Sequence, residues 1–369
     1  MNLKIGIVGL PNAGKSTLFN ALLKKQVADA APYPFCTIEP NVGIVPVPDE
    51  RLTKLAEITK AEEKMDKLPP LVPAVVEFVD IAGLVKGASV GEGLGNKFLS
   101  HIREVDIICH VVRNFVDPSV VHVEGELNPL RDRDIIDTEL ILADLQTLTK
   151  QVEPFGFATG KPQGKSTEED FKRWRVILKA RVGLDGGRSA RDVITDPDEK
   201  DLIRDLQLLS AKPVLYAVNV SENELENSTN RELESAHNSL VICAKTESEL
   251  VSLTPDEQKD YLAALGQTAS GLDRLIRKAY ELLGLISFLT TGVIEARAWT
   301  IKKGTLAPEA AGVIHTDFEK KFIKADVVAF EEFVLMNGWK ASRANGKVRQ
   351  EGRVYEMRDG DVVEFKIGS

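Results

Sequence analysis

Residues 9–17 combine glycines, a lysine and two hydroxyl side chains at a spacing suited to binding a chain of phosphates. They match the pattern G-x-x-x-x-G-K-[ST]. Glycines let the backbone turn so that several N–H groups point at one anion. Lys15 would contact the β- and γ-phosphates, and the Ser16 hydroxyl would coordinate Mg²⁺. The motif predicts a phosphate-binding loop, and the alternative is a glycine-rich turn that binds no phosphate.

Two later positions extend this chemistry. Asp80 and Gly83 form a D-x-x-G motif at the end of an apolar stretch. The aspartate can hold Mg²⁺ through water, and the Gly83 N–H can contact a γ-phosphate. Thr37 lies between the motifs, where its hydroxyl would complete the Mg²⁺ shell in the triphosphate state. A lone D-x-x-G is a weak signal, but the three features in this order indicate a switch-type nucleotide hydrolase.

The residues expected to contact the base depart from the guanine-reading pattern. A GTPase is expected to carry Asn-Lys-x-Asp after the corresponding strand, and this chain has Asn219, Val220, Ser221 and Glu222. The missing lysine and the longer acid change the guanine-binding motif at two positions. Such changes can lower the selectivity for guanine over other bases by several orders of magnitude. Asn219 could still bond to purine N7 or to an adenine amino group. The alternative is a polar loop without a role in base binding.

These motifs need a scaffold, and the apolar periodicity supplies one. Strand-like runs at 4–8, 74–80, 107–112, 213–218 and 240–243 alternate with helical patterns. This alternation is typical of an α/β fold with a mostly parallel sheet and helices on both faces. Binding loops should lie at the carboxyl ends of the strands, where Gly9, Asp80, Asn219 and Ala244 fall.

A helical insertion and a C-terminal α+β domain interrupt this pattern. We expect an antiparallel helical hairpin within residues 127–211, with two ordinary surface helices as the alternative. Its apolar seam would contain Ile141, Leu145, Leu148, Val152, Phe171, Trp174, Leu178 and Val182. From residue 285 onward the pattern favours a mixed sheet that includes a strand at 294–301. We also expect a hairpin pairing 354–357 with 362–365.

Composition restricts the class of protein. The 369 residues are 43% hydrophobic and 28% charged, as in a soluble globular protein, and no apolar run is long enough to span a bilayer. The phosphate-loop strand begins at once and leaves no room for a signal peptide. The cysteines, Cys36, Cys109 and Cys243, form no C-x-x-C pair, which favours a reducing cytoplasm. The net charge is −9, yet residues 285–369 hold 13 Lys and Arg against 12 Asp and Glu, which permits a local basic face.

On these motifs the chain resembles the YchF-type, Obg-like P-loop ATPases of the translation-factor GTPase class. The matching segments are 9–17, 34–41, 78–88, 91–96, 219–222, 297–300 and 310–319. The resemblance implies an Obg-like G-domain (1–126 and 212–284), an inserted α-helical coiled coil (127–211) and a β-grasp TGS domain (285–369). It also implies a Mg²⁺-dependent hydrolase that prefers ATP over GTP, and association with the ribosome (large subunit or whole) and with RNA through the TGS and coiled-coil domains. Phosphates would be bound by Asn12, Ala13, Gly14, Lys15, Ser16 and Thr17, Mg²⁺ by Ser16, Thr37 and Asp80, and the base by Asn219, Val220 and Glu222.

Hydrolysis lacks an obvious water-orienting residue. Ras-like enzymes place Gln after D-x-x-G, and this chain has Leu84, so we expect a low basal rate. Lys15 and Gly83 would act on the phosphates. Three candidates could position the attacking water instead. The first is a K⁺ ion beside Asn12, by analogy with related GTPases. The second is His122, in the loop after strand 107–112, and the third is a group from a partner such as the ribosome. A packed or surface role remains the alternative for His122, and His110, inside the strand, reads as structural.

Other functions stay open. One is a GTPase switch with an RNA-binding TGS domain, and another is an RNA-binding protein with a mainly structural nucleotide site. An RNA-facing patch would use Lys320, Lys321, Lys324, Arg343, Lys347, Arg349 and Arg353. Phe318 and Trp339 would stack on bases or lie in the core. A small-molecule kinase would need a lid with several arginines, and those at 173, 175 and 181 fit the solvated side of a helix better. We expect a monomer.

Overall fold

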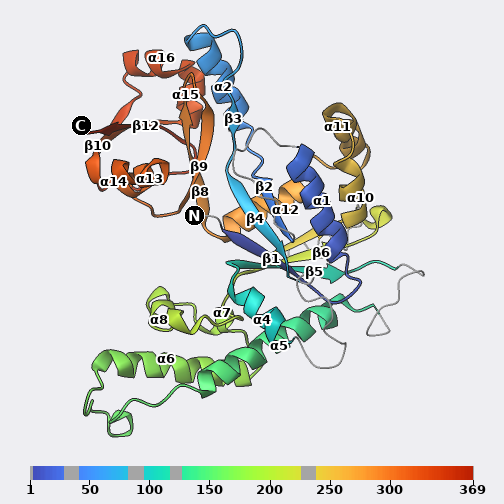
Figure 1. Cartoon of the computed structure of the whole chain (residues 1–369), viewed down its shortest axis with the longest axis vertical. Coiled ribbons are helices and arrows are strands. Elements are labelled where there is room, and N and C mark those ends of the chain that lie inside the picture. Colours follow the sequence, from blue (N-terminus) through green and yellow to red (C-terminus); the bar gives the residue numbers. More distant parts are fainter. Residues whose placement is uncertain (1–2, 29–40, 82–94, 117–126, 226–237, 369) are drawn as a thin grey trace.

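A six-stranded sheet carries the phosphate-loop motif. The computed structural model describes residues 3–28, 41–81, 95–116, 127–225 and 238–368. The strand order is β2-β4-β1-β5-β6-β7, and only β2 runs antiparallel to its neighbour. The strands are β1 (Lys4–Val8), β2 (Val42–Pro46), β4 (Val75–Asp80), β5 (Ile107–Arg113), β6 (Val214–Asn219) and β7 (Ser239–Ile242). All five strands expected here are present, and β2 is an addition at the edge (Figure 1).

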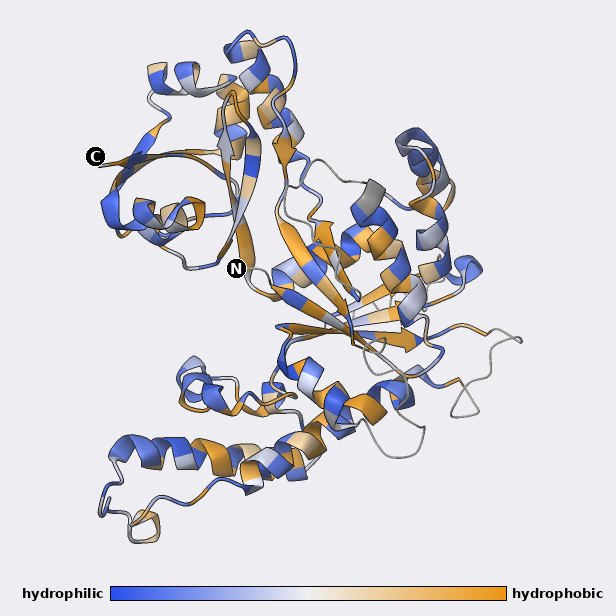
Figure 2. Cartoon of the chain, in the orientation of Figure 1, coloured by the Kyte–Doolittle hydropathy of each residue, from blue (hydrophilic) through white to orange (hydrophobic). Residues whose placement is uncertain are grey.

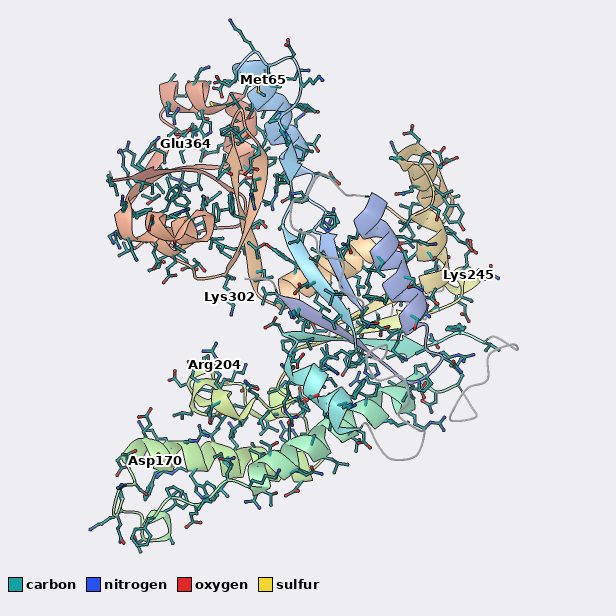
Figure 3. The ribbon with its side chains drawn as sticks, in the orientation of Figure 1. Met65, Asp170, Arg204, Lys245, Lys302 and Glu364 are labelled. Atoms are coloured by element: carbon teal, nitrogen blue, oxygen red, sulfur yellow. The ribbon has the colours of Figure 1, made fainter. Side chains whose placement is uncertain are left out.

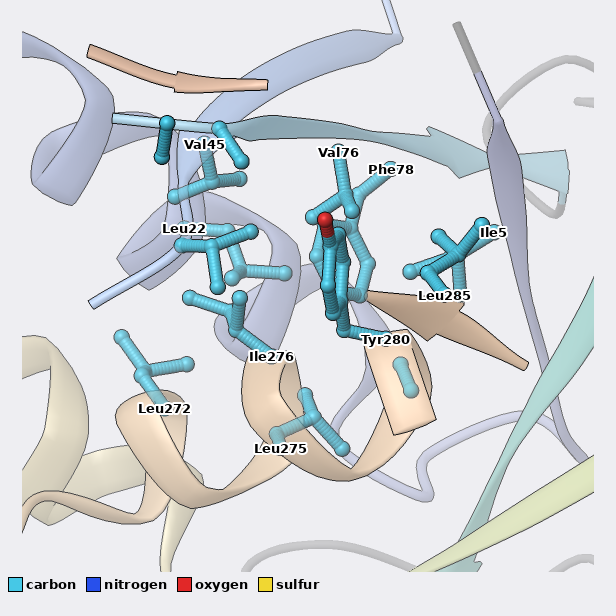
Figure 4. Packing of buried hydrophobic residues seen from close by; sticks show 14 of the residues in the cluster. Ile5, Leu22, Val45, Val76, Phe78, Leu272, Leu275, Ile276, Tyr280 and Leu285 are labelled. Carbon is cyan, nitrogen blue, oxygen red and sulfur yellow. The ribbon is translucent and has the colours of Figure 1, made fainter. Parts of the chain in front are cut away.

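Helices bury both faces of this sheet, which explains why its strands read as continuous apolar runs. The helices around it include α1 (Lys15–Ala28), α4 (Asn96–Arg103), α10 (Ala244–Leu250), α12 (Gly271–Leu282) and part of α5 (Pro129–Thr149). Helix α11 (Pro255–Ala264), which has no buried residue, follows α10. On one face Leu22 and Ile276, from α1 and α12, pack with Phe78 in one cluster (Figure 4). On the other, Ile102 of α4 packs with Ile108 in a separate cluster. The sheet is therefore a rigid support for the loops at its carboxyl edge.

The helical insertion forms an arm that extends away from the sheet (Figure 1). It contains α5 (Pro129–Thr149), η1 (Phe157–Thr159), α6 (Glu168–Asp185), α7 (Ala190–Val193), α8 (Pro197–Leu202) and η2 (Arg204–Leu206). The Asn128 side chain caps α5, and Thr167 with Asp170 forms a capping box on α6. Figure 3 labels Asp170 at the far end of the arm. Ile141, Leu148, Trp174 and Ile177 share the arm's core.

Two residues expected in the seam of this hairpin are not there. Val152 lies beyond the end of α5 and is 86% exposed, and Val182 is 74% exposed. The buried stripe of α6 runs through Phe171, Trp174 and Ile177 and on to Ala180 and Leu184. Because this stripe advances in steps of about three to four residues, Val182 falls between its members and faces solvent.

A second six-stranded sheet forms the C-terminal part. Its order is β11-β10-β12-β8-β9-β3, and it is mixed, as expected. The strands are β8 (Leu285–Thr291), β9 (Ala296–Lys302), β10 (Phe322–Ala329), β11 (Arg349–Glu351), β12 (Asp361–Ile367) and β3 (Leu71–Val72). The helices are α13 (Ala307–Ile314), α14 (Thr316–Lys321), α15 (Phe330–Met336) and α16 (Trp339–Ala344), with α2 (Arg51–Glu62) from the N-terminal half. Neighbouring residues Phe288 and Leu289 enter different clusters, so both faces are buried. In Figure 2 the strands of both sheets are largely hydrophobic and the helices two-faced.

The hairpin expected between 354–357 and 362–365 is wrong. Residues 354–357 form no strand, and Val354 is 87% exposed, while Glu356 makes a single bridge to Leu306. The second half is strand β12, which pairs with β10 on one side and β8 on the other. Because both edges of β12 are occupied, no position remains for 354–357 as a partner strand.

The segment that joins the two sheets was not anticipated. After β2 the chain crosses to the C-terminal sheet, where α2 packs and β3 pairs with β9. The Arg51 guanidinium donates to Asp49 at 2.8 Å and to Asp359 at 2.7 Å. At the other end of α2, Glu62 accepts hydrogen bonds from the backbone N–H groups of Trp339 and Lys340. A segment early in the sequence thus holds the C-terminal part against the first sheet.

Candidate functional site

The loop between β1 and α1 has a backbone that only glycine tolerates at two positions. Gly9 has φ 149° and Gly14 has φ 96°. A Cβ on Gly9 would lie 2.3 Å from the Val111 carbonyl oxygen, and one on Gly14 would lie 2.2 Å from Asn219 Nδ2. The two glycines therefore allow the loop to approach β5 and β6 closely, and α1 begins at Lys15 directly after it. The first N–H groups of a helix have no partner within it and can bind an anion.

Lys15 is held inside the loop. It is 9% exposed, and its Nζ donates to the Leu10 carbonyl oxygen at 2.7 Å. Burial lowers the pKa of Lys15, and the nearby Asp80 carboxylate opposes that shift. Asp80 is 5% exposed and lies at the carboxyl end of β4. The ammonium is thus positioned near an acid and bonded to a carbonyl oxygen that a phosphate oxygen can replace.

Asn219 fastens the phosphate loop to a second loop. Its Nδ2 donates to the Ala13 carbonyl oxygen at 3.0 Å, and its Oδ1 accepts from the Ala244 N–H at 3.0 Å. The side chain is 5% exposed, so both bonds are shielded from water. Both polar ends of this carboxamide are therefore committed to positioning two loops.

A pocket of about 780 Å³ opens along these loops. Its described lining comes from the ends of four strands: Asn12, Gly14, Lys15, Ser16, Thr17, Phe115, Val116, Asn219, Val220, Ser221, Glu222, Asn223, Cys243, Ala244 and Lys245. The structure thus brings together all but one of the residues expected to bind the phosphates (12–17) and the base (Asn219, Val220 and Glu222). The exception is Ala13, which is buried and contributes its carbonyl to Asn219.

The loop after β6 places Glu222 at the pocket. Val220 is buried, and its N–H donates to the Ile242 carbonyl oxygen. Ser221 and Glu224 form a capping box around the short turn η3 (Glu222–Glu224). The Glu222 carboxylate accepts a 2.7 Å hydrogen bond from the hydroxyl of Tyr261 in α11.

Sequence reasoning missed several lining residues. Phe115, Val116 and Lys245 were not proposed, although they follow β5 and β7 and so obey the rule that loops at strand ends bind ligands. Tyr261 had no such signal, because it comes from a helix far along the chain.

Three of the expected site residues, Thr37, Gly83 and His122, lie outside the described residues, as does Leu84. The other histidine considered, His110, is 1% exposed in β5, and its ring centroid lies 5.6 Å from that of Tyr216. Burial lowers the pKa of His110 to about 4. A neutral, packed imidazole agrees with the structural reading of this residue.

The donor set near Lys15 fits a magnesium ion. Ser16 lines the pocket with a hydroxyl, and Asp80 provides a carboxylate next to the Lys15 ammonium. Mg²⁺ prefers such hard oxygen ligands and keeps several waters when it binds with substrate phosphates. Asn12, Gly14 and Thr17 line the same pocket, which has room for those phosphates.

Five of the seven basic residues considered for RNA divide into two groups. Arg343, Lys347 and Arg349 form ion pairs with Glu364, Glu332 and Glu351. Trp339 is 7% exposed and packs on Phe333, so its ring belongs to the core. Lys320 and Lys321 are exposed at the end of α14.

Comparisons with known proteins agree with this architecture. Residues 4–143 match a family described as 50S ribosome-binding GTPase, and residues 285–368 match the YchF GTPase C-terminal family, described as a protein of unknown function. The chain is 46% identical to the ribosome-binding ATPase YchF of Bacillus subtilis, with 100% of each chain covered. It is 47% identical to the protein of that name from Haemophilus influenzae, covering 100% of this chain and 99% of the relative. A solved YchF GTPase from Schizosaccharomyces pombe matches with a TM-score of 0.87 and 38% identity, over 99% of this chain and 98% of the other.

The sheet, the glycine-dependent loop and the buried lysine define a P-loop nucleotide-binding domain of the GTPase class. The fold is α/β, with a helical arm and a C-terminal α+β part. The chain belongs to the YchF family, as its motifs suggested. No helix within the described segments has the length and apolar character needed to cross a membrane.

Proposed function

We propose that this protein is a Mg²⁺-dependent hydrolase of nucleoside triphosphates that prefers ATP and acts as a ribosome-associated switch in the cytoplasm. The observation that carries the proposal is the pocket in which Lys15 and Ser16 face the loop that bears Glu222. Relatives that match over their whole length carry the name ribosome-binding ATPase, which supports both the nucleotide and the partner. We further propose a monomer with a G-domain (1–126 and 212–284), a coiled-coil domain (127–211) and a TGS domain (285–369), the last two being candidates for contact with RNA.

In this proposal each residue of the pocket has one task. The N–H groups at Asn12 to Thr17 and the Lys15 ammonium bind the phosphates, and Lys15 leaves the Leu10 carbonyl to do so. Ser16 and Asp80, together with Thr37, hold Mg²⁺, which neutralises charge on the β- and γ-phosphates when bound. The Gly83 N–H senses the γ-phosphate. Burial of Lys15 strengthens its attraction for an anion, because the local dielectric is low.

ATP preference is supported by the state of the base loop. Asn219 makes one hydrogen bond from Nδ2 and one to Oδ1 within the protein, which leaves a second donor and a second acceptor for purine N7 or the adenine amino group. Val220 replaces the lysine of the guanine-reading pattern. Glu222 is one methylene longer than the usual acid. The loop therefore carries its paired carboxylate acceptors on a longer side chain and at a different reach from those of the guanine-reading pattern.

A slow basal rate follows from Leu84, which can neither donate to nor accept from a water molecule. We propose that the attacking water is positioned by one of three groups: a K⁺ ion bound beside Asn12, the His122 side chain, or a group from the ribosome. A transition-state charge stabiliser provided by a partner can raise such rates by factors of about 10³ to 10⁵.

The test is phosphate release from ATP by the purified full-length chain, with and without ribosomes, in K⁺ and in Na⁺. We expect slow turnover alone and faster turnover with ribosomes, and no turnover by the Lys15→Ala variant. Fast hydrolysis that neither ribosomes nor the cation changes would contradict the proposal. Ribosome co-sedimentation without any ATP hydrolysis would favour an RNA-binding protein with a structural nucleotide site.

A further inference from the structure

The Glu222 carboxylate is held from outside its own loop. Tyr261 lies in α11, 39 residues further along the chain, and its hydroxyl donates to Glu222 Oε1 at 2.7 Å. This hydrogen bond raises the pKa of the Tyr261 phenol to about 12, above an ordinary value at which the hydroxyl is already a donor at neutral pH. In Figure 1, α11 lies beside α10, whose Lys245 lines the same pocket (labelled in Figure 3).

We propose that Tyr261 determines base specificity by turning the Glu222 carboxylate away from the edge of the bound base. The inference rests on the proposed ATP preference and extends it from the loop to a helix that the motif does not contain. Tyr261 is a positioning residue, because it acts through Glu222.

The hydrogen-bonding patterns of the two purines explain the effect. Guanine presents two adjacent donors, N1–H and the 2-amino group, and a carboxylate that faces them accepts both. Adenine presents an acceptor at N1, which a facing carboxylate would repel. A carboxylate held toward α11 therefore cannot accept the two hydrogen bonds from guanine. It also does not repel N1 of adenine. The extra methylene of glutamate provides reach, and the capping box of Ser221 and Glu224 fixes the turn from which it extends.

The strength of the interaction suits this role. The Tyr261 bond is charge-assisted but exposed to solvent, so it competes with the hydrogen bonds that a base would offer without fixing Glu222 irreversibly. Its loss should change the ratio of GTP to ATP dissociation constants by about tenfold, since 1.4 kcal/mol corresponds to a factor of ten.

The experiment measures dissociation constants of ATP, GTP and inosine triphosphate for the full-length chain and its Tyr261→Phe variant. Inosine triphosphate has N1–H but lacks the 2-amino group. We expect the variant to gain affinity most for GTP, less for inosine triphosphate and not for ATP. Tyr355→Phe is the matched control, because it also removes a tyrosine–carboxylate bond (2.9 Å, to Asp361), but in the C-terminal part. It should leave all three constants unchanged.

The double variant Tyr261→Phe/Glu222→Gln separates positioning from a merely structural role. Glutamine lacks the two equivalent acceptors, so the gain for GTP should disappear. A lower melting temperature of Tyr261→Phe with an unchanged GTP to ATP ratio would overturn the inference, as would a GTP gain that persists in the double variant. Wild-type protein that binds no nucleotide would instead refute the proposed function itself.

Discussion

Replacement of Asn219 by alanine should lower the stability of the protein and weaken the link between the two loops that line the pocket. The side chain bridges the phosphate loop and the loop after β7 through two 3.0 Å hydrogen bonds, to Ala13 and from Ala244, and it is 5% exposed. Alanine would leave a buried carbonyl and a buried N–H without these bonds. Each unsatisfied group costs about 1–3 kcal/mol. Since both depend on one side chain their costs are not additive, and we expect a loss of about 2–4 kcal/mol in the free energy of unfolding.

Urea denaturation followed by circular dichroism measures that loss, and titration with a fluorescent ATP analogue measures the effect on binding. Asn223→Ala is the matched control, because Asn223 lines the same pocket but is exposed. It should change stability by less than about 0.5 kcal/mol. Asn219→Asp keeps the acceptor for Ala244 but sets a buried carboxylate oxygen against the Ala13 carbonyl oxygen, so it should be at least as destabilising as alanine. An Asn219→Ala variant as stable as wild type, with equal ATP affinity, would refute the bridging role.

Other substitutions probe separate parts of the structure. His110 is neutral when buried, and its pKa of about 4 lies below the ordinary 6.5. At a pH between these two pKa values, His110 is protonated in the unfolded chain but neutral in the folded one, so the free energy of unfolding should fall as pH falls. Denaturant titrations should show a loss of about 2 kcal/mol from pH 7 to pH 5. His110→Gln should flatten that dependence, and an equal slope in both proteins would contradict it. Arg51→Ala should lower the free energy of unfolding by about 1–3 kcal/mol, because it removes charge-assisted bonds from α2 to Asp49 and to Asp359. The exposed Lys54→Ala control should have almost no effect, and equal losses would argue against the link. Lys15→Ala should lower ATP affinity at least 100-fold in equilibrium titrations, and unchanged affinity would disprove the phosphate site.

The sequence was most informative where short-range physics dominates. The phosphate loop was predictable because Gly9 and Gly14 occupy backbone conformations that other residues rarely adopt. The parallel strands were predictable because burial on both faces requires continuous apolar runs, as in β5. Helix starts such as Thr167 followed by Asp170 also carry a local capping signal.

Features that depend on distant pairing could not be predicted in this way. Residues 354–357 alternate like a strand, but β12 has its two edges filled by β10 and β8. The crossing of α2 and β3 to the C-terminal sheet depends on partners such as Asp359, which lies 308 residues beyond Arg51. Tyr261 belongs to the same category, since only the folded chain brings it to Glu222.

The central claim is that the pocket around Lys15 binds a triphosphate without favouring guanine. A competition titration, in which ATP and GTP displace a fluorescent nucleotide from the purified wild-type chain in Mg²⁺, tests it most directly. We predict that ATP displaces the probe at a lower concentration than GTP, and that the Lys15→Ala variant binds no probe. Displacement by GTP at the lower concentration would contradict the account of the base loop, and probe binding that survives in Lys15→Ala would contradict the site.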